Sequence, residues 1–387
     1  MPEQLSVRTL RPQRGLVTAP GVDAAVLRQQ RRGRLFAAMD LHDLDVLILG
    51  RPASITYASG LQPLWLAGSR PFGPACVVVR AGEAVHLLVA SDHGAPADIP
   101  HSHLYGTTWN PATLLDELRA IPGLVAARRV GTDASTADLT DLLAAVAPAA
   151  ATVDGTPAVR SAREIKTPEE LLRIEAAVSV AERALRAMTA AVRAGASPRQ
   201  LLAVCADHLA RDGFPIVPTE AVALSASGTM DVRSVMETRR IEPGRLVGLS
   251  PTAVWEGYEG GLSRTAVAGP HEPTVLQQRL AQRCRAALDA VTAECRAGRS
   301  GADLHRAWTA LESPPVLPLA HGLGIGVETP LIAADRGGEA VLCDGMVLAI
   351  QGWLAEPDVG GVLEGDVVVV SAAGPRVLGS WPPGLVA

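Results

Sequence analysis

Two glycine-rich segments in the second half of the chain constrain the fold more than any other feature. Residues 226–269 read ASGTMDVRSVMETRRIEPGRLVGLSPTAVWEGYEGGLSRTAVAG, and residues 321–330 read HGLGIGVETP. Short apolar runs of strand length alternate there with Gly and Pro, which predicts short β-strands and tight turns. The chain has 387 residues. Because a single core rarely grows past about 250–300 residues, we expect two domains.

The composition is typical of a globular protein and argues against several partners. Hydrophobic residues make up 48% of the chain and charged residues 19%, and the formal net charge is −5. This balance disfavours nucleic acid or an anionic membrane as a partner. The N-terminus lacks the apolar region of a signal peptide, and no apolar run reaches the roughly 18–20 residues that span a bilayer. We therefore expect a cytoplasmic protein.

The cysteines predict neither a disulfide framework nor a zinc site. They are odd in number, widely spaced and include no Cys-x-x-Cys pair. Their positions are Cys76, Cys205, Cys284, Cys295 and Cys343. No other motif predicts a cofactor.

The pattern of the chain changes near residue 160. In residues 1–160, strand-like apolar runs alternate with helical stretches, which indicates a layered α/β domain. Residues 161–387 open with a helix start in which Thr167 is the expected N-cap, Pro168 the first helical residue and Glu170 part of an acidic first turn. A long amphipathic helix and a second helix follow, and short strands dominate beyond them.

Motifs in the second part occur in the order and spacing of one family. They are Arg163-x-Ile165-Lys166-x-Pro168-x-Glu170, Ser227-Gly228, Pro243-Gly244, Gly257-Tyr258, Arg264-Thr265, His321-Gly322-x-Gly324, Pro330 and Gly345-Met346-Val347. With these motifs the second part resembles the pita-bread family of creatinases, prolidases, aminopeptidases P and methionine aminopeptidases. The first part resembles the family's creatinase-type N-terminal domain, notably at Ile55-Thr-Tyr57-x-Ser59-Gly60.

The resemblance implies an α/β (α+β) fold with a creatinase-like N-terminal α/β domain over residues 1–160 and a pita-bread domain over residues 161–387. The pita-bread domain is expected to contain two related α–β halves around a curved antiparallel sheet. The resemblance also implies a small-molecule substrate and a homodimer in which each N-terminal domain helps to close the partner's site.

Metal-dependent members of the family bind two divalent ions through two Asp, one His and two Glu, and four of these five positions are neutral here. The residues at the five positions are Ser250, Gly261, His321, Gln351 and Gly365. Glu364 precedes the last position, but a shift of one residue along a strand turns the side chain to the opposite face. Roughly four positive charges held by one imidazole would have an untenable desolvation cost. The sequence therefore predicts a site without metal.

Three ionisable residues are candidates for acid–base catalysis in such a site: His321, Glu328 and Glu259. His321 is retained from the family's metal centre, and an ordinary pKa of about 6.5 suits proton transfer near neutral pH. A structural hydrogen-bonding role is the alternative. Glu328 stands at the family's second His position and either partners His321 or is an exposed loop carboxylate. Glu259 shares a strand face with Gly261, or lies on an edge-strand surface.

Seven residues are candidates for substrate binding: Arg233, Ser250, Tyr258, Arg264, Gln351, Trp65 and Arg70. Arg233 falls at the family's upstream His position, where it either binds a carboxylate with two hydrogen bonds or lies in a solvated loop. Ser250 and Gln351 can hydrogen-bond a polar substrate. Tyr258 and Arg264 either line the site or brace it.

Creatinase is the family's precedent for metal-free hydrolysis of a C–N bond, and it uses an Arg from the partner's N-terminal domain. Trp65 and Arg70 follow Ser59-Gly60 in a similar arrangement, so they are candidates for capping the site. Ser263 and Gln351 stand where creatinase has Glu, so creatine is not the expected substrate.

We therefore expect a metal-independent enzyme that acts on a small polar, amino-acid-like molecule by hydrolysis, elimination, decarboxylation or cyclisation. One alternative is a catalytically silent member that binds a ligand or partner in the old site. The other is an Xaa-Pro dipeptidase with a rearranged metal site.

Overall fold

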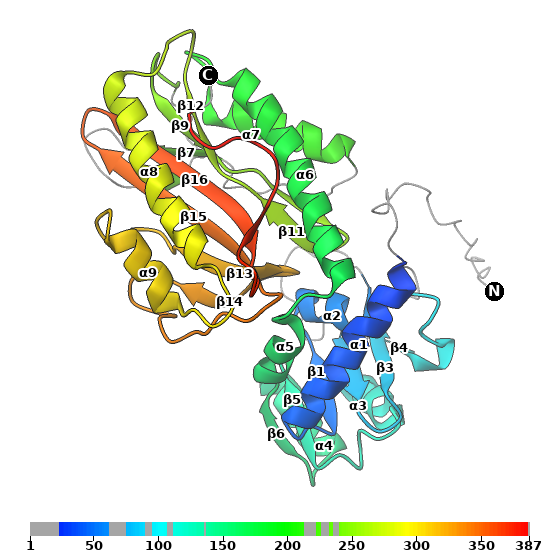
Figure 1. The fold of residues 1–387 in the computed structure, drawn as a ribbon. Coiled ribbons are helices and arrows are strands. Elements are labelled where there is room, and N and C mark those ends of the chain that lie inside the picture. Colours follow the sequence, from blue (N-terminus) through cyan, green and yellow to red (C-terminus); the bar gives the residue numbers. More distant parts are fainter. Residues whose placement is uncertain are drawn as a thin grey trace, which may run out of the picture.

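A computed structural model describes most of the chain and shows a mixed α/β fold with two domains (Figure 1). The described residues are 23–61, 75–89, 95–106, 111–134, 137–212, 222–225, 232–234 and 240–385. The domain limits at residue 160 stay a prediction.

A six-stranded mixed sheet forms the centre of the N-terminal domain. In spatial order its strands are β4 (Leu104–Gly106), β3 (Ala84–Val89), β2 (Ala75–Val79), β1 (Val46–Leu49), β5 (Arg129–Thr132) and β6 (Ala151–Asp154). The central strand β1 is wholly buried, as expected for a sheet covered on both faces. One face packs on α1 (Ala24–Leu41), α2 (Pro52–Ser59) and α5 (Thr156–Arg163), the other on α3 (Pro111–Ala120) and α4 (Ala137–Val146). A 3-10 turn, η1 (His101–His103), precedes β4.

Helix α6 (Pro168–Ala191) leads into the larger domain and begins where the sequence predicts. Thr167 Oγ1 accepts the Glu170 N–H at 3.2 Å, and the Glu170 carboxylate accepts the Thr167 N–H at 2.8 Å. Such a cap contributes about 1 kcal/mol. Because Glu170 Oε1 also accepts the Tyr258 hydroxyl at 2.7 Å, the start of α6 is fixed to strand β11 (Tyr258–Gly261).

The larger domain has two antiparallel sheets, each covered by a pair of helices (Figure 1). The first sheet has the order β12 (Arg264–Val267), β9 (Leu246–Leu249), β7 (Val222–Ser225), β8 (Val232–Ser234) and packs on α6 and α7 (Pro198–Arg211). The second has the order β14 (Gly326–Ile332), β13 (Ala320–Gly324), β15 (Val347–Glu356), β16 (Gly360–Val369), β17 (Arg376–Leu378) and packs on α8 (Val275–Glu294) and α9 (Gly301–Thr309). Strands β10 (Thr252–Trp255) and β11 form a separate hairpin.

The two sheets meet where the start of β12 lies against β16, and we call this junction the seam. Ser263 and Gly365 exchange two backbone hydrogen bonds, each of 3.0 Å. The Thr265 hydroxyl donates to the Leu363 carbonyl at 2.9 Å and accepts the Leu363 N–H at 2.8 Å. These four bonds join the two halves of the domain directly.

The largest hydrophobic cluster contains side chains of both domains. Leu35 and Tyr57 of the N-terminal domain share it with Tyr258 and Val367 of the larger one. The guanidinium carbon of Arg31 lies 5.7 Å from the ring centre of Tyr57 and 4.8 Å from that of Tyr258, which is cation–π distance. The N-terminal domain is thus anchored to the larger domain of its own chain.

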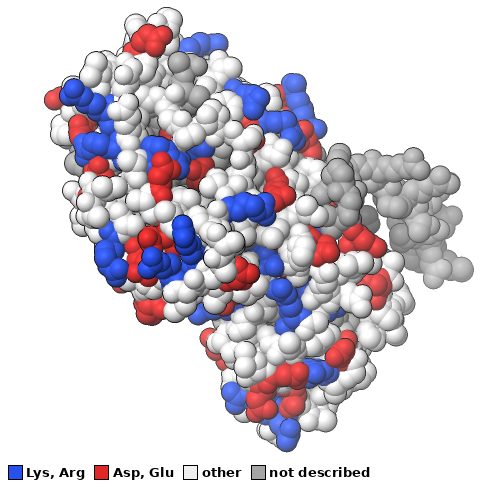
Figure 2. Space-filling view, in the orientation of Figure 1, with Lys and Arg blue, Asp and Glu red and all other residues white. Residues whose placement is uncertain are grey.

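The described surface carries charges of both signs. On the face shown in Figure 2, basic and acidic side chains are interspersed, and no broad region of one sign appears among the described residues. Within the same part of the chain, no helix combines the length and apolar character needed to cross a membrane.

Candidate active site

His321 lies on the face of the second sheet that is turned away from α8 and α9. It pairs in register with Ala349 on β15, and two residues further along β15 Gln351 pairs with Gly365 on β16. Gly365 in turn is bridged to Ser263 across the seam. Because residues two apart on a strand share a face, this row of residues lines one side of the sheet. Several of the residues predicted to form the site are therefore brought together.

The hydrogen bonds of His321 define which ring nitrogen is free. Nδ1 lies 3.0 Å from the Gly322 carbonyl oxygen, and a carbonyl oxygen can only accept, so in the neutral ring Nδ1 carries the proton. No hydrogen bond to Nε2 is made by any residue in the described part of the chain. The Nε2 lone pair is consequently available to take a proton from a ligand.

Two neutral polar groups accompany His321. The Ser250 hydroxyl lies 2.7 Å from the Ser263 hydroxyl, and Gln351 donates to the Pro318 carbonyl at 3.2 Å. Both Ser250 and Gln351 are half-buried. They satisfy part of their hydrogen-bonding capacity within the protein and retain further donors and acceptors for a polar ligand.

Glu328 is held by two cations of the α5–α6 connection and makes no hydrogen bond to His321. One carboxylate oxygen accepts from Arg163 at 2.7 Å, and the other accepts from Lys166 at 2.7 Å. Burial alone would raise the pKa of Glu328, but the two cations outweigh it and hold the pKa below its ordinary value. So paired, Glu328 is neither an exposed loop carboxylate nor a good proton acceptor, and its contacts are those of a structural residue.

Glu259 lies near the tip of the β13–β14 hairpin and is half-buried. A Cβ added at Gly326 would lie 3.9 Å from its Oε1. Burial, together with the negative charge of Glu328, raises the pKa of Glu259. No described residue forms a hydrogen bond or ion pair with this carboxyl group, so it is free to exchange a proton with a ligand.

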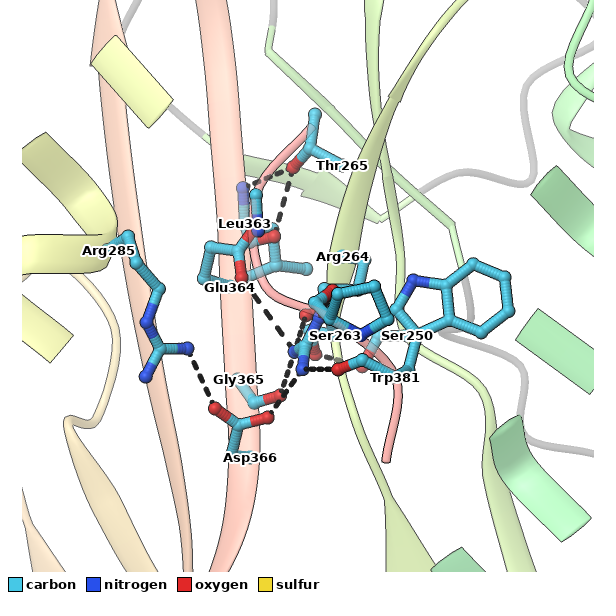
Figure 3. Close-up of polar contacts among 12 residues, drawn as sticks. Ser250, Ser263, Arg264, Thr265, Arg285, Leu363, Glu364, Gly365, Asp366 and Trp381 are labelled. Atoms are coloured by element: carbon cyan, nitrogen blue, oxygen red, sulfur yellow. Dashed lines mark hydrogen bonds and ion pairs between the residues drawn. The ribbon is translucent and has the colours of Figure 1, made fainter. Parts of the chain in front are cut away.

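Tyr258 and Arg264 make the contacts of bracing residues, one of the two roles that the sequence left open. Tyr258 is 1% exposed and donates its hydroxyl to Glu170. All five N–H groups of Arg264 are used (Figure 3): its acceptors are Ser263 O, Gly365 O, Asp366 Oδ1, Trp381 O and Pro382 O. Arg264 therefore has no donor left for a substrate.

Three predicted residues cannot be placed in the site. Trp65 and Arg70 lie outside the described residues, and for Arg233 only the backbone is described, on β8 opposite Leu224. Their roles remain predictions.

Comparisons with known proteins assign the family. Residues 173–372 match the model of metallopeptidase family M24, and residues 31–165 match that of the creatinase/prolidase N-terminal domain. The chain belongs to family M24. An Xaa-Pro dipeptidase of Pyrococcus furiosus is 22% identical over 366 residues, which cover 90% of this chain and 97% of the relative.

Solved structures share the M24 fold over almost the whole chain. The prolidase of Pyrococcus horikoshii OT3 has a TM-score of 0.77 at 19% identity and covers 92% of this chain and 100% of its own. Dipeptidase PepE of Mycobacterium ulcerans has a TM-score of 0.73 at 21% identity and covers 95% of this chain and 99% of its own. At such identities the likeness establishes the fold alone.

The donor set at the M24 metal positions does not fit a pair of divalent cations. It offers one imidazole, one amide and one hydroxyl, whereas hard cations require several carboxylates. The described residues contain no group of three or more His, Cys, Asp or Glu side chains suited to a metal ion. Added Cβ atoms would also be crowded, at 2.9 Å from the Pro251 oxygen for Gly261 and 2.9 Å from the Ile350 oxygen for Gly365.

The carboxylates that flank Gly365 in this M24 member are turned away from His321. The β15–β16 register is regular from Val347–Val369 to Glu356–Gly360, so no bulge rotates Glu364 toward the site. Asp366 is instead bound by Arg264 and by Arg285 of α8, at 2.7 and 2.8 Å. The expectation that Glu364 lies on the opposite face is confirmed.

Because of the buried carboxyl group of Glu364, we expect the protein to lose stability as the pH rises from 4.5 to about 8. Burial raises its pKa from 4.5 to about 8, although Arg264 and Arg285 oppose the shift. The folded state thus keeps a proton that the unfolded chain has released, and this stabilisation is full below pH 4.5 and lost as the pH rises through about 8. In urea unfolding between about pH 6 and pH 9, we expect Glu364→Gln to lose less stability than wild type. The exposed Glu339→Gln is the control, and equal slopes for wild type and Glu364→Gln would refute the prediction.

Sequence reasoning missed the partners of the site residues. Arg163 and Lys166 were recognised as part of a family motif, but not as the cations that neutralise Glu328. Their positions are 165 and 162 residues away from Glu328. The available signal was that one motif holds two cations while Glu328 replaces a neutral or basic family residue in the site region.

Proposed function

We propose that this M24 member is a metal-independent enzyme of the creatinase or Xaa-Pro-peptidase type. It acts on a small polar, amino-acid-like molecule, with His321 as general acid–base. The observation that carries the proposal is the His321 ring, because the Gly322 carbonyl fixes Nδ1 as the donor and leaves Nε2 open on the face lined by Gln351. A neutral imidazole with one free nitrogen is suited to proton transfer near neutral pH.

Glu259 is the second acid–base candidate in this proposal. Its raised pKa means that the carboxyl group keeps a proton at a higher pH than an ordinary glutamate does. It can therefore protonate a leaving nitrogen while His321 accepts a proton elsewhere on the ligand. Ser250 and Gln351 supply neutral hydrogen bonds that orient the substrate. Arg233 stays a candidate for binding a substrate carboxylate, and Trp65 and Arg70 stay candidates for capping the site from the N-terminal domain of a partner in a homodimer.

A silent binding protein is the second candidate, and one observation favours it. Ser250 and Gln351 already use part of their hydrogen-bonding capacity within the protein, in the Ser250–Ser263 and Gln351–Pro318 contacts. A site whose other polar groups are neutral can hold a ligand without transforming it. A third candidate, Xaa-Pro dipeptidase activity with a rearranged metal site, is supported by the match to the metallopeptidase family and by the names of the relatives.

One set of assays separates these functions. Wild type, His321→Ala and the control His271→Ala, which alters an exposed histidine, are tested on Xaa-Pro dipeptides and small amino-acid amides with EDTA or with Mn²⁺. We expect turnover that persists in EDTA, falls about 10²–10⁴-fold in His321→Ala and is unchanged in His271→Ala.

Other results would overturn metal-independent catalysis. Turnover that requires Mn²⁺ would establish a rearranged metal site. A ligand-induced thermal shift that depends on His321, without turnover of any compound, would establish the silent binder.

A further inference from the structure

The last described residues of the chain, 379–385, run between α6 and β16, and we call them the C-terminal clasp (Figure 1). On the α6 side, one oxygen of Glu182 accepts the N–H groups of Ser380 and Trp381, the latter at 2.8 Å. Arg186 lies over the Trp381 ring, 5.0 Å from its centre. Gly379 has a φ of +97°, and a Cβ there would lie 2.8 Å from Glu182 Oε1. The positive φ therefore favours glycine at this position.

On the other side the clasp is bound to β16 by the Gly384 N–H, which donates to Glu364 Oε1 at 3.3 Å, and to the seam by the guanidinium group of Arg264. Arg264 donates to the Trp381 carbonyl at 2.9 Å and to the Pro382 carbonyl at 3.0 Å. The same side chain donates to the Ser263 carbonyl at 2.7 Å and to the Gly365 carbonyl at 2.8 Å. Figure 3 shows Arg264 between Trp381 and the strand that carries Gly365.

We propose that Arg264 is a positioning residue, through which the C-terminal clasp fixes the seam that carries the candidate active site. The link to activity depends on the proposed function, whereas the effect on the seam does not.

The burial of Arg264 explains why the clasp should matter to the seam. The residue is 2% exposed, so it cannot replace a lost acceptor with bulk water. Release of the clasp removes two of the five acceptors of Arg264, the Trp381 and Pro382 carbonyls. The buried guanidinium group must then shift to find other acceptors. Any such shift weakens its bonds to the Ser263 and Gly365 carbonyls. Because the same two carbonyl groups accept the backbone N–H groups that pair Ser263 with Gly365, we expect this pairing to loosen first.

Amide hydrogen exchange tests the inference without a substrate. We compare wild type with Glu182→Ala, with a chain that ends at Gly379, and with Arg264→Lys. The last variant keeps the positive charge but removes the planar guanidinium group and its five N–H donors. The matched control is Glu175→Ala, because Glu175 is also on α6 but its carboxylate binds Arg376 and not the clasp. We expect peptides that contain Ser263 and Gly365 to exchange about tenfold faster in the three clasp variants. Peptides from the β13–β15 pairing should exchange as in wild type, and Glu175→Ala should show no change.

Unchanged exchange at the seam, or faster exchange throughout the domain, would overturn the proposal. If Arg264→Lys fails to fold, Glu182→Ala and the shortened chain still decide. In the turnover assay for His321, a positioning role predicts that Glu182→Ala lowers kcat about tenfold while KM stays within about twofold. A fall in thermal stability with unchanged kcat would indicate a structural role only. Absence of turnover in wild type would refute the proposed function, and the exchange result would still test the clasp.

Discussion

Replacement of Glu328 by Gln is expected to lower the free energy of unfolding by about 3–5 kcal/mol, the cost of leaving a buried charge without its partner. The carboxylate bridges Arg163 and Lys166, whose side chains are 11% and 2% exposed, while its own is 9% exposed. An amide of the same shape fills the space but removes the negative charge. Lys166 then remains buried and uncompensated.

Urea unfolding at neutral pH measures this cost against a matched surface pair. Asp335 pairs with Arg336 at the surface, where both side chains are more than half exposed, so Asp335→Asn should cost at most about 1 kcal/mol. In the Glu328→Gln background, Lys166→Met should recover part of the loss because it removes the orphaned ammonium group. A cost for Glu328→Gln no larger than that of the control would contradict the predicted effect.

Mild acid is expected to destabilise the N-terminal domain through His86. This residue of β3 is 1% exposed, and neither ring nitrogen has a hydrogen-bond partner among the described residues. Its ring stacks on that of His103 with centres 4.2 Å apart, and Tyr105 lies 5.8 Å away. Burial, together with His103, lowers the pKa of His86 from 6.5 to about 4.

The sign of the pH effect follows from where the proton binds. Between pH 6.5 and about 4 the unfolded chain takes up a proton that folded His86 refuses, so stability is lost as the pH falls through this range. The loss is about 3 kcal/mol at most. We expect His86→Leu to flatten the dependence of the unfolding free energy on pH in that window. The exposed His101→Gln should retain the wild-type slope, and an equal slope for His86→Leu would refute the role of His86.

Local sequence signals were sufficient to predict elements that have a capping motif at one end or a continuous apolar run. Thr167, Pro168 and Glu170 predicted the start of α6 because the capping box and the proline act within one turn. The buried strands β2 and β3 follow directly from their apolar runs. Helix α1 was not predicted, since its polar run and Gly33 weaken the apolar pattern. Strands of three residues, such as β8 and β17, are too short to show a period.

The site could be predicted only as far as motif spacing reaches. His321, Gln351 and Gly365 could be identified because each position was tied to a family motif. Strand pairing then places the three residues on one face of the sheet. The pairing of Glu328 with Lys166 depends on how the α5–α6 connection meets the β13–β14 hairpin, which no local pattern encodes. The same holds for Arg264, whose acceptors include carbonyl groups more than 100 residues away. Every residue has a backbone carbonyl group, so the residue type does not reveal which carbonyl groups accept hydrogen bonds from Arg264.

The crowding at Gly261 and Gly365 bears on how this chain can evolve. A side chain at either position meets main-chain oxygen atoms at 2.9 Å, so a carboxylate restored by one codon change would first have to displace a strand. Two such changes, together with acids in place of Ser250 and Gln351, would be needed at once. Each single mutation toward a carboxylate at Gly261 or Gly365 would therefore meet this backbone crowding before the other acidic groups were in place.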